Sequence, residues 1–144
     1  MKVIFACVHN AGRSQMAAAF FNRYCDPGKA CAVSAGTKPG IKVHPEVLLA
    51  MEEESVDLST VKPQLLSDKL AEDAKMLITM GCGETCPTLP GLNRTDWALP
   101  DPKGQPIERV REIRDQVKQL VQNLVKELGV AKETSDVKAT ANEY

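Results

Sequence analysis

The sequence of 144 residues lacks the features that mark several large classes of protein. Its 18 lysines and arginines nearly balance its 19 acidic residues, for a net charge of −1, whereas proteins that bind nucleic-acid phosphates carry a strong local excess of basic side chains. No apolar run approaches the ~20 residues that span a bilayer. The first residues, MKVIFAC, contain no signal-peptide cleavage site. We therefore expect a cytoplasmic protein that binds neither nucleic acid nor membrane.

The chain is also poor in metal ligands and in paired cysteines. It has two histidines, His9 and His44, and the odd number of five cysteines: Cys7, Cys25, Cys31, Cys82 and Cys86. In a reducing compartment such cysteines are buried hydrophobes, metal ligands or reactive thiols rather than structural disulfides. Cys25 and Cys31 fall at a helix end and in a strand, so we expect them to pack in the core.

Short apolar runs alternate with amphipathic stretches along the chain. Strands are expected at residues 1–7, 31–34, 75–80 and 96–99, and helices at 13–24, 44–54, within 66–74, and at 106–128. This alternation predicts an α/β fold: a single domain with a four-stranded parallel sheet and helices on both faces. Gly129 is expected to end the last helix. Residues 1–129 form the predicted domain, and the polar residues 130–144 are predicted to be a disordered tail.

The residues with chemical potential follow the predicted strands. Cys7, the loop that contains Cys82, and the loop that contains Asp101 each come directly after a strand. Ligands of open parallel sheets bind at the carboxyl ends of the strands. We therefore expect these three loops to converge at one edge of the sheet.

The stretch CVHNAGRS joins the first strand to the first helix and predicts an anion site. Backbone N–H groups and the helix dipole favour an anion there, and Arg13 adds a planar set of donors. The same positive environment favours the thiolate of Cys7. Ser14 is placed to hydrogen-bond that sulfur, and Asn10 to hold the loop shape. The predicted oxyanion-binding residues are Val8, His9, Asn10, Ala11, Gly12, Arg13 and Ser14.

This loop has two simpler interpretations. The first is a buried cysteine beside an unrelated surface arginine, which would require Cys, five residues, Arg and Ser to occur together by chance at a strand–helix junction. An ATP-type P-loop is excluded because the spacing GxxxxGK[ST] is absent.

CVHNAGRS matches the Cys-x5-Arg-Ser/Thr signature of the low-molecular-weight protein tyrosine phosphatase fold. The continuation RSQMA resembles the arsenate reductases of that fold rather than its phosphatases, which usually have proline after the serine. SAGT at residues 34–37, VHPE at 43–46, DLS at 57–59 and DP at 101–102 also fit in order. The resemblance covers roughly residues 1–128.

The resemblance implies reduction of arsenate to arsenite by thiols acting in sequence. Cys7 would form a thiol–arsenate adduct, Cys82 would resolve it, and Cys86 would take over the disulfide by exchange. No bound cofactor or metal is implied, and a monomer is expected. Thioredoxin, or glutathione or mycothiol with a glutaredoxin-type protein, would regenerate the thiols. A zinc site at Cys82 and Cys86, or two inert buried cysteines, are the alternative interpretations of MGCGETCP.

Asp101, in LPDPKG, matches the general acid of the fold, although an ordinary Asp-Pro turn is the simpler interpretation. Lys103 and Gly104 follow where the phosphatases usually carry aromatic residues, which favours arsenate, with phosphate or sulfate as analogues, over a phosphotyrosine ring. The runner-up function is a protein tyrosine or aryl phosphatase that uses Cys7, Arg13 and Asp101. A non-catalytic oxyanion or redox sensor is a third.

Some arsenate reductases of this fold hold a potassium ion behind the anion loop with a carboxylate from the first helix. Ala18 stands at the matching position here. An ammonium group from Lys62 in that place is one hypothesis, and a solvated surface lysine is the other.

Overall fold

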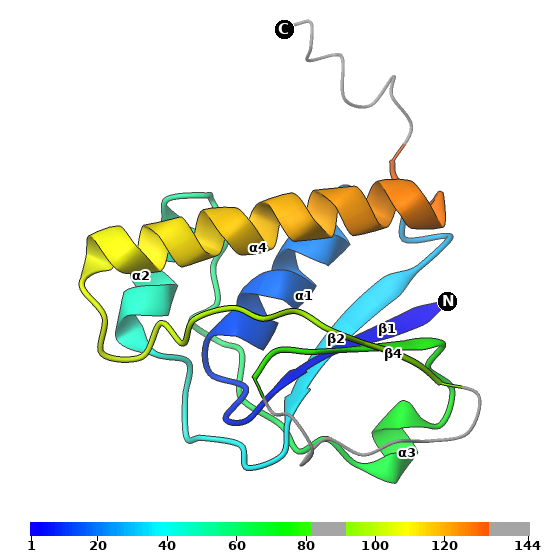
Figure 1. Ribbon diagram of the computed structural model, residues 1–144, viewed down its shortest axis with the longest axis horizontal. Helices are drawn as coiled ribbons and strands as arrows, with labels where there is room; N and C mark the ends of the chain where they lie inside the picture. Colours follow the sequence, from blue (N-terminus) through cyan, green and yellow to red (C-terminus); the bar gives the residue numbers. More distant parts are fainter. Residues whose placement is uncertain (82–91, 133–144) are drawn as a thin grey trace, which may run out of the picture.

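The computed structural model describes residues 1–81 and 92–132 (Figure 1). The elements in chain order are β1 (Lys2–Cys7), α1 (Arg13–Tyr24), β2 (Cys31–Gly36), α2 (Pro45–Glu52), α3 (Asp68–Ala71), β3 (Met76–Thr79), β4 (Asn93–Asp96) and α4 (Ile107–Leu128). Within the described ranges, no helix combines the length and the apolar character needed to cross a membrane.

The four strands form one parallel sheet in the order β2-β1-β3-β4. Side chains of the central strand β1 alternate between two apolar clusters. Val3 and Phe5 pack with α1, α2 and α4 on one face, whereas Ile4 and Ala6 pack with Leu66 and the α3 region on the other. Figure 1 shows the same division of the helices. The predicted α/β fold with helices on both faces is confirmed.

Local sequence signals placed the two longest helices well. The helix α1 has the predicted bounds, and α4 begins one residue after the predicted start, because Pro106 acts as its N-cap. Gly129 adopts the left-handed conformation with φ of 69° and ends α4 as expected. The shorter helix α3 is capped by Ser67, whose hydroxyl oxygen accepts a hydrogen bond from the N–H of Leu70 at 3.1 Å.

The predicted fourth strand at residues 96–99 is wrong, because β4 spans Asn93–Asp96. All four residues of β4 are exposed on this edge strand, so no apolar pattern marked it. Its position is set by pairing with β3, in which Asp96 lies opposite Thr79 and accepts a hydrogen bond from the Thr79 hydroxyl at 2.6 Å. The apolar residues after it serve the core instead. The ring of Trp97 packs at 5.7 Å from that of Phe5.

The chain continues to pack against the domain after α4. Val130 is buried, and its carbonyl accepts a hydrogen bond from Asp26 N–H at 2.7 Å. Lys132 N–H donates to the carbonyl of Tyr24 at 3.1 Å. The first three residues of the predicted tail therefore close the turn after α1, and residues 133–144 lie outside the described residues.

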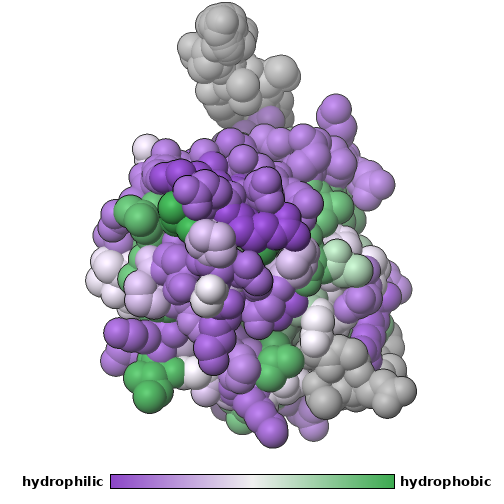
Figure 2. Space-filling model, turned by 60° about the vertical axis from the view of Figure 1, so that its left-hand side comes forward, coloured by the Kyte–Doolittle hydropathy of each residue, from purple (hydrophilic) through white to green (hydrophobic). Residues whose placement is uncertain are grey.

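The face that Figure 2 presents is mainly hydrophilic, and hydrophobic residues are scattered over it. In the described part of the chain, the most exposed large hydrophobic side chain is that of Ile41, and the others of this kind are Met1, Leu49, Val61 and Leu65. Single exposed apolar residues are normal on a globular protein and mark no binding surface by themselves.

Candidate active site

A small pocket lies at the carboxyl end of β1, where the sequence predicted an anion site. Its lining consists of Cys7, His9, Ala11, Gly12, Arg13, His44 and Asp101. The structure thus brings together Cys7, Arg13 and Asp101, although Asp101 lies 94 residues beyond Cys7 in the chain. Cys82 and Cys86 lie outside the described residues.

The backbone carbonyls of residues 7–12 are all engaged in hydrogen bonds within the protein. Each one accepts a hydrogen bond from a surrounding group, in chain order the backbone N–H of Thr37, Lys38 and Gly40, the side chain of Gln15, and the backbone N–H of His44 and Met16. In a trans peptide the N–H points opposite to the C=O. The N–H groups of the loop are therefore directed inward, together with the free N–H groups at the start of α1.

Asn10 fixes the shape of the loop, as predicted. It is fully buried and adopts a positive φ of 53°, a conformation that asparagine tolerates better than most residues. Its side-chain oxygen accepts hydrogen bonds from Gln64 N–H at 2.9 Å and from Gln15 Nε2 at 3.2 Å. These donors fix the orientation of the amide, so its Nδ2 donates to Ser14 Oγ at 2.7 Å.

Ser14 connects this network to the sulfur of Cys7. The two atoms Sγ and Oγ lie 2.9 Å apart, and both residues are buried. Because the Ser14 oxygen already accepts from Asn10, its own proton is free to be donated to the sulfur. A hydrogen bond donated to a thiolate stabilises the charged form. The predicted contact between Ser14 and Cys7 is therefore present.

Arg13 lies at the start of α1 with 11% of its side chain exposed. Its Nη1 donates to the carbonyl of Leu99 at 3.0 Å, and its Nη2 lies 3.8 Å from Asp101 Oδ2. Asp101 is about half exposed, and its other oxygen accepts from Lys103 N–H at 3.0 Å. The carboxylate is thus held at the mouth of the pocket, where an acid would meet a leaving oxygen.

Two glycines allow close approaches around Arg13. Gly81 has a φ of 86°, and a Cβ on it would lie 2.6 Å from Arg13 Nη1. A Cβ on Gly12 would lie 2.9 Å from Pro102 Cγ. The absence of a side chain on Gly12 therefore lets the Asp101–Pro102 loop lie against the anion loop, and Gly81 leaves room for the guanidinium.

His44 is a lining residue that the sequence reasoning did not assign to the site. Burial lowers the pKa of its imidazole, and the nearby positive charge of Lys103 and the other histidine, His9, act in the same direction. The carboxylates of Glu46 and Asp101 oppose this shift. In the sequence, the only signal for a role of His44 is the VHPE segment, which places a histidine at the start of a helix that comes later in the chain than the anion loop.

Lys62 is exposed. The buried hydrogen bonds behind the loop come from Asn10, Ser14, Gln15 and the backbone of Gln64 instead. Ala18, which the sequence resemblance places behind the anion loop, is buried. The exposed position of Lys62 agrees with the simpler hypothesis of a solvated surface lysine.

The remaining described cysteines lie away from the pocket. Cys25 is buried, as predicted, and burial raises the pKa of its thiol. The expectation for Cys31 is wrong, because it is exposed as the first residue of β2. Among residues 1–81 and 92–132, no three His, Cys, Asp or Glu side chains are grouped to hold a metal ion.

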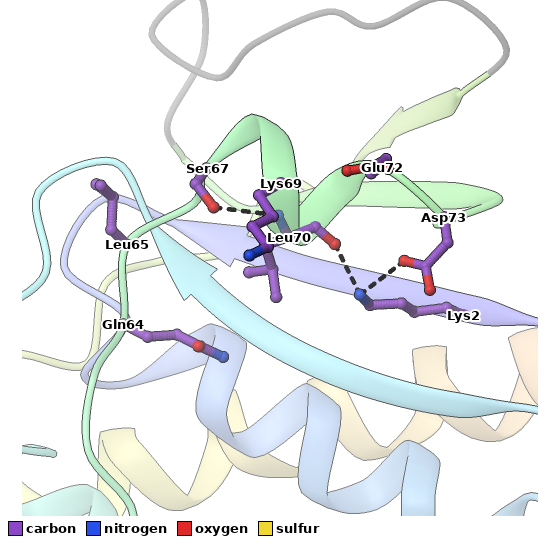
Figure 3. Close-up of a pocket in the computed structure, with 8 residues that line it drawn as sticks. All are labelled: Lys2, Gln64, Leu65, Ser67, Lys69, Leu70, Glu72 and Asp73. Carbon is purple, nitrogen blue, oxygen red and sulfur yellow. Dashed lines mark hydrogen bonds and ion pairs between the residues drawn. The ribbon is translucent and has the colours of Figure 1, made fainter.

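A second pocket lies on the α3 face of the sheet (Figure 3). Its lining residues are Lys2, Gln64, Leu65, Ser67, Lys69, Leu70, Glu72 and Asp73. Lys2 Nζ donates to the carbonyl of Leu70 at 2.7 Å and to Asp73 at 2.9 Å. The described residues of this lining include neither cysteine nor histidine, so we assign the chemistry to the pocket at Cys7.

Comparison with known proteins agrees with this geometry. The family model described as low molecular weight phosphotyrosine protein phosphatase matches residues 2–134. The chain therefore belongs to this family. The resemblance seen in the sequence and the predicted fold class are thereby confirmed.

Within the family, the chain is similar to arsenate reductases. The glutaredoxin arsenate reductase of Synechocystis is 36% identical over 127 residues, which cover 86% of this chain and 95% of the relative. The thioredoxin-dependent arsenate reductase of Corynebacterium glutamicum is 36% identical, with a TM-score of 0.77 over 89% of this chain and only 61% of that one. A structure described as an arsenate reductase in oxidized state is 34% identical, with a TM-score of 0.76 over 88% and 97%.

Proposed function

We propose that this protein reduces arsenate to arsenite through a covalent adduct on Cys7, acting as a monomer in the cytoplasm. The observation that carries the proposal is the buried thiol of Cys7. It receives a hydrogen bond from Ser14 and opens onto a pocket lined by inward N–H groups and Arg13. Similarity to arsenate reductases supports this choice of substrate.

In the first step the Cys7 thiolate attacks arsenic, and an S–As bond replaces an As–OH bond. The leaving hydroxide takes a proton from Asp101 and departs as water. Loop N–H groups and Arg13 stabilise the negative oxygens of the adduct. A tetrahedral oxyanion fits this position because its charge is met by donors that the loop already holds in place.

In the second step the Cys82 thiolate attacks the sulfur of Cys7. The S–As bond breaks, its electron pair stays on arsenic, and arsenite leaves while a Cys7–Cys82 disulfide forms. Ser14 stabilises Cys7 as the leaving thiolate when Cys86 then attacks Cys82 and forms the Cys82–Cys86 disulfide. A dithiol of thioredoxin, or glutathione or mycothiol with a glutaredoxin-type protein, reduces that disulfide by two electrons.

The test is arsenate-dependent oxidation of NADPH, assayed separately with a thioredoxin system and with a glutathione or mycothiol system containing a glutaredoxin-type protein. Cys82→Ser is expected to abolish turnover in both. Cys31→Ser is the matched control, because this exposed thiol lies opposite Lys2 at the amino end of the strands, whereas Cys7 lies at the carboxyl end. Unchanged turnover in Cys82→Ser would overturn the relay, and a disulfide map after one turnover reports whether Cys82 and Cys86 pair.

A phosphatase acting on phosphotyrosine or aryl phosphates is the second candidate. It is favoured by the family and by the shared set of Cys7, Arg13 and Asp101. The exposed Lys103 after Asp101–Pro102 provides no aromatic wall for a phosphotyrosine ring. This second candidate predicts that Cys82→Ser hydrolyses aryl phosphate as fast as the wild type. It also predicts that neither protein reduces arsenate.

A further inference from the structure

Both histidines of the chain line the pocket at Cys7, but they are held differently. His9 is exposed, whereas His44 is half-buried at the N-terminus of α2. The N–H of His44 donates to the carbonyl of Ala11 at 2.9 Å, and its ring carbon Cδ2 lies 3.5 Å from the place of a Cβ on Gly12. The backbone of His44 is therefore tied to the anion loop, and its ring lies beside Gly12.

Burial and nearby charges determine whether the neutral or the protonated imidazole of His44 is favoured. Burial is the largest influence and lowers its pKa, and the positive charge of Lys103 adds to this. Glu46 and Asp101 oppose the shift without reversing it. The surroundings of His44 therefore favour its neutral imidazole over the protonated form.

A bound dianion changes this balance. The lining offers one permanent cation, Arg13, and part of its charge is already directed to Asp101 at 3.8 Å. A dianion in the loop adds two negative charges close to His44, and a nearby negative charge favours the protonated imidazole. Of the two histidines in the lining, His9 is exposed, whereas His44 is half-buried beside the loop.

We infer that His44 is an additional oxyanion-binding residue, which takes up a proton from solvent when a dianion binds in the loop of residues 7–14. This inference rests on the oxyanion site proposed above. The proton goes to an imidazole nitrogen, and no covalent bond to the ligand is made. The consequence is that the site binds dianions more tightly as the pH falls through the titration range of His44.

Sulfate is the suitable probe because it stays a dianion over this range, so any pH dependence belongs to the protein. The Cys7→Ser chain is used so that no thiol titrates in the pocket, and the wild-type chain under reducing conditions is measured beside it. Imidazole proton NMR gives two sets of signals, one for each histidine, and His9→Asn assigns them. Calorimetric titration with sulfate between about pH 5.5 and about pH 8.5 gives the affinity.

We expect saturating sulfate to raise the titration midpoint of His44 by about one pH unit or more. Sulfate affinity should then be about tenfold higher below both midpoints than above them. His44→Gln should remove this pH dependence, so that the ratio of low-pH to high-pH affinity falls to about one. A purely structural role would instead lower the affinity by a similar factor at every pH and preserve the ratio. His9→Asn should keep the pH dependence.

Two results overturn the inference, and they are distinguishable. Sulfate binding with an unshifted His44 midpoint and no pH dependence refutes the role of His44 while leaving the oxyanion site intact. No sulfate binding in either the folded Cys7→Ser chain or the wild type refutes the oxyanion site itself, and the inference falls with it.

Discussion

Arg13 in the pocket and Arg114 on α4 are both largely buried, with 11% and 10% of their side chains exposed, but their partners differ. Arg114 donates to the carbonyl of Ala50 and to the carboxylates of Glu53 and Asp115, all within 2.9 Å. Among the described residues, Arg13 has one hydrogen bond, to the carbonyl of Leu99, and a carboxylate at 3.8 Å. The charge of Arg114 is met by the protein, whereas Arg13 keeps donors for a ligand.

The side chains around Arg114 and those around Arg13 also have different roles. Arg114 belongs to a group of charged side chains that ties α4 to the end of α2, which we name the α2–α4 ion cluster: Arg111, Arg114 and Lys118 with Glu53, Glu54 and Asp115. The hydrogen bonds to Asp115 and Glu53 outweigh burial and raise the pKa of Arg114. A paired cluster stabilises the fold, and an incompletely paired cation at a helix N-terminus binds an anion.

The sharpest test of this comparison exchanges each arginine for lysine. Arg13→Lys keeps the charge and loses the planar set of donors, so arsenate turnover should fall by at least about 100-fold. Arg114→Lys should leave turnover of the folded protein unchanged. Steady-state kinetics on both variants, with circular dichroism to confirm folding, checks the prediction. Equal losses in the two variants would refute the distinction between a ligand arginine and a structural one.

A smaller effect is expected from Gly81→Ala, which adds a methyl group 2.6 Å from Arg13 Nη1. The guanidinium must shift, so turnover should fall by about tenfold, since misplaced donors stabilise the adduct less. Gly104→Ala is the matched control. Gly104 also has a positive φ, 72°, but nothing lies within 4 Å of an added Cβ. Both variants should lose about 1 kcal/mol of stability from backbone strain, and only Gly81→Ala should lose activity.

The ion cluster is tested through stability. Arg114→Ala leaves the buried carbonyl of Ala50 without its side-chain donor and removes one of the two arginines that hydrogen-bond Glu53, so the free energy of unfolding should fall by about 2 kcal/mol. Arg109→Ala on the same helix removes only an exposed pair with Glu112 and should cost less than about 0.5 kcal/mol. Urea denaturation monitored by circular dichroism measures both. A loss as small for Arg114→Ala as for Arg109→Ala would show that the cluster is not structural.

The smallest effect concerns pH. Hydrogen bonds from Arg111 and then Arg114 lower the pKa of Glu53 to about 2 in the folded protein. A lowered folded pKa means that the ionised form contributes stability above the unfolded pKa, and that this contribution is lost as the pH falls toward about 2. Glu53→Gln should therefore be less stable than the wild type at neutral pH, and the difference should shrink on acidification. A difference independent of pH would contradict this assignment.

The sequence predicted the part of the site that is continuous in the chain. The bounds of α1, the loop after Cys7 and the contacts of Asn10 and Ser14 follow from residues within one strand–loop–helix unit. The edge strand β4 was misplaced, because its four exposed polar residues carry no apolar pattern and its position comes from pairing with β3. Cys31 was expected to be buried, but the edge position that exposes it is a property of the assembled sheet.

By itself, the sequence determined that a cysteine, a short loop and an arginine stand at a helix start, because these features are local and their hydrogen-bonding geometry is short-range. Only the tertiary structure decided what surrounds them. The carbonyl of Leu99, the carboxylate of Asp101 and the imidazole of His44 reach the loop from separate segments of the chain. Their approach depends on how parallel strands and helices pack, and such long-range packing leaves no periodic signal in the sequence.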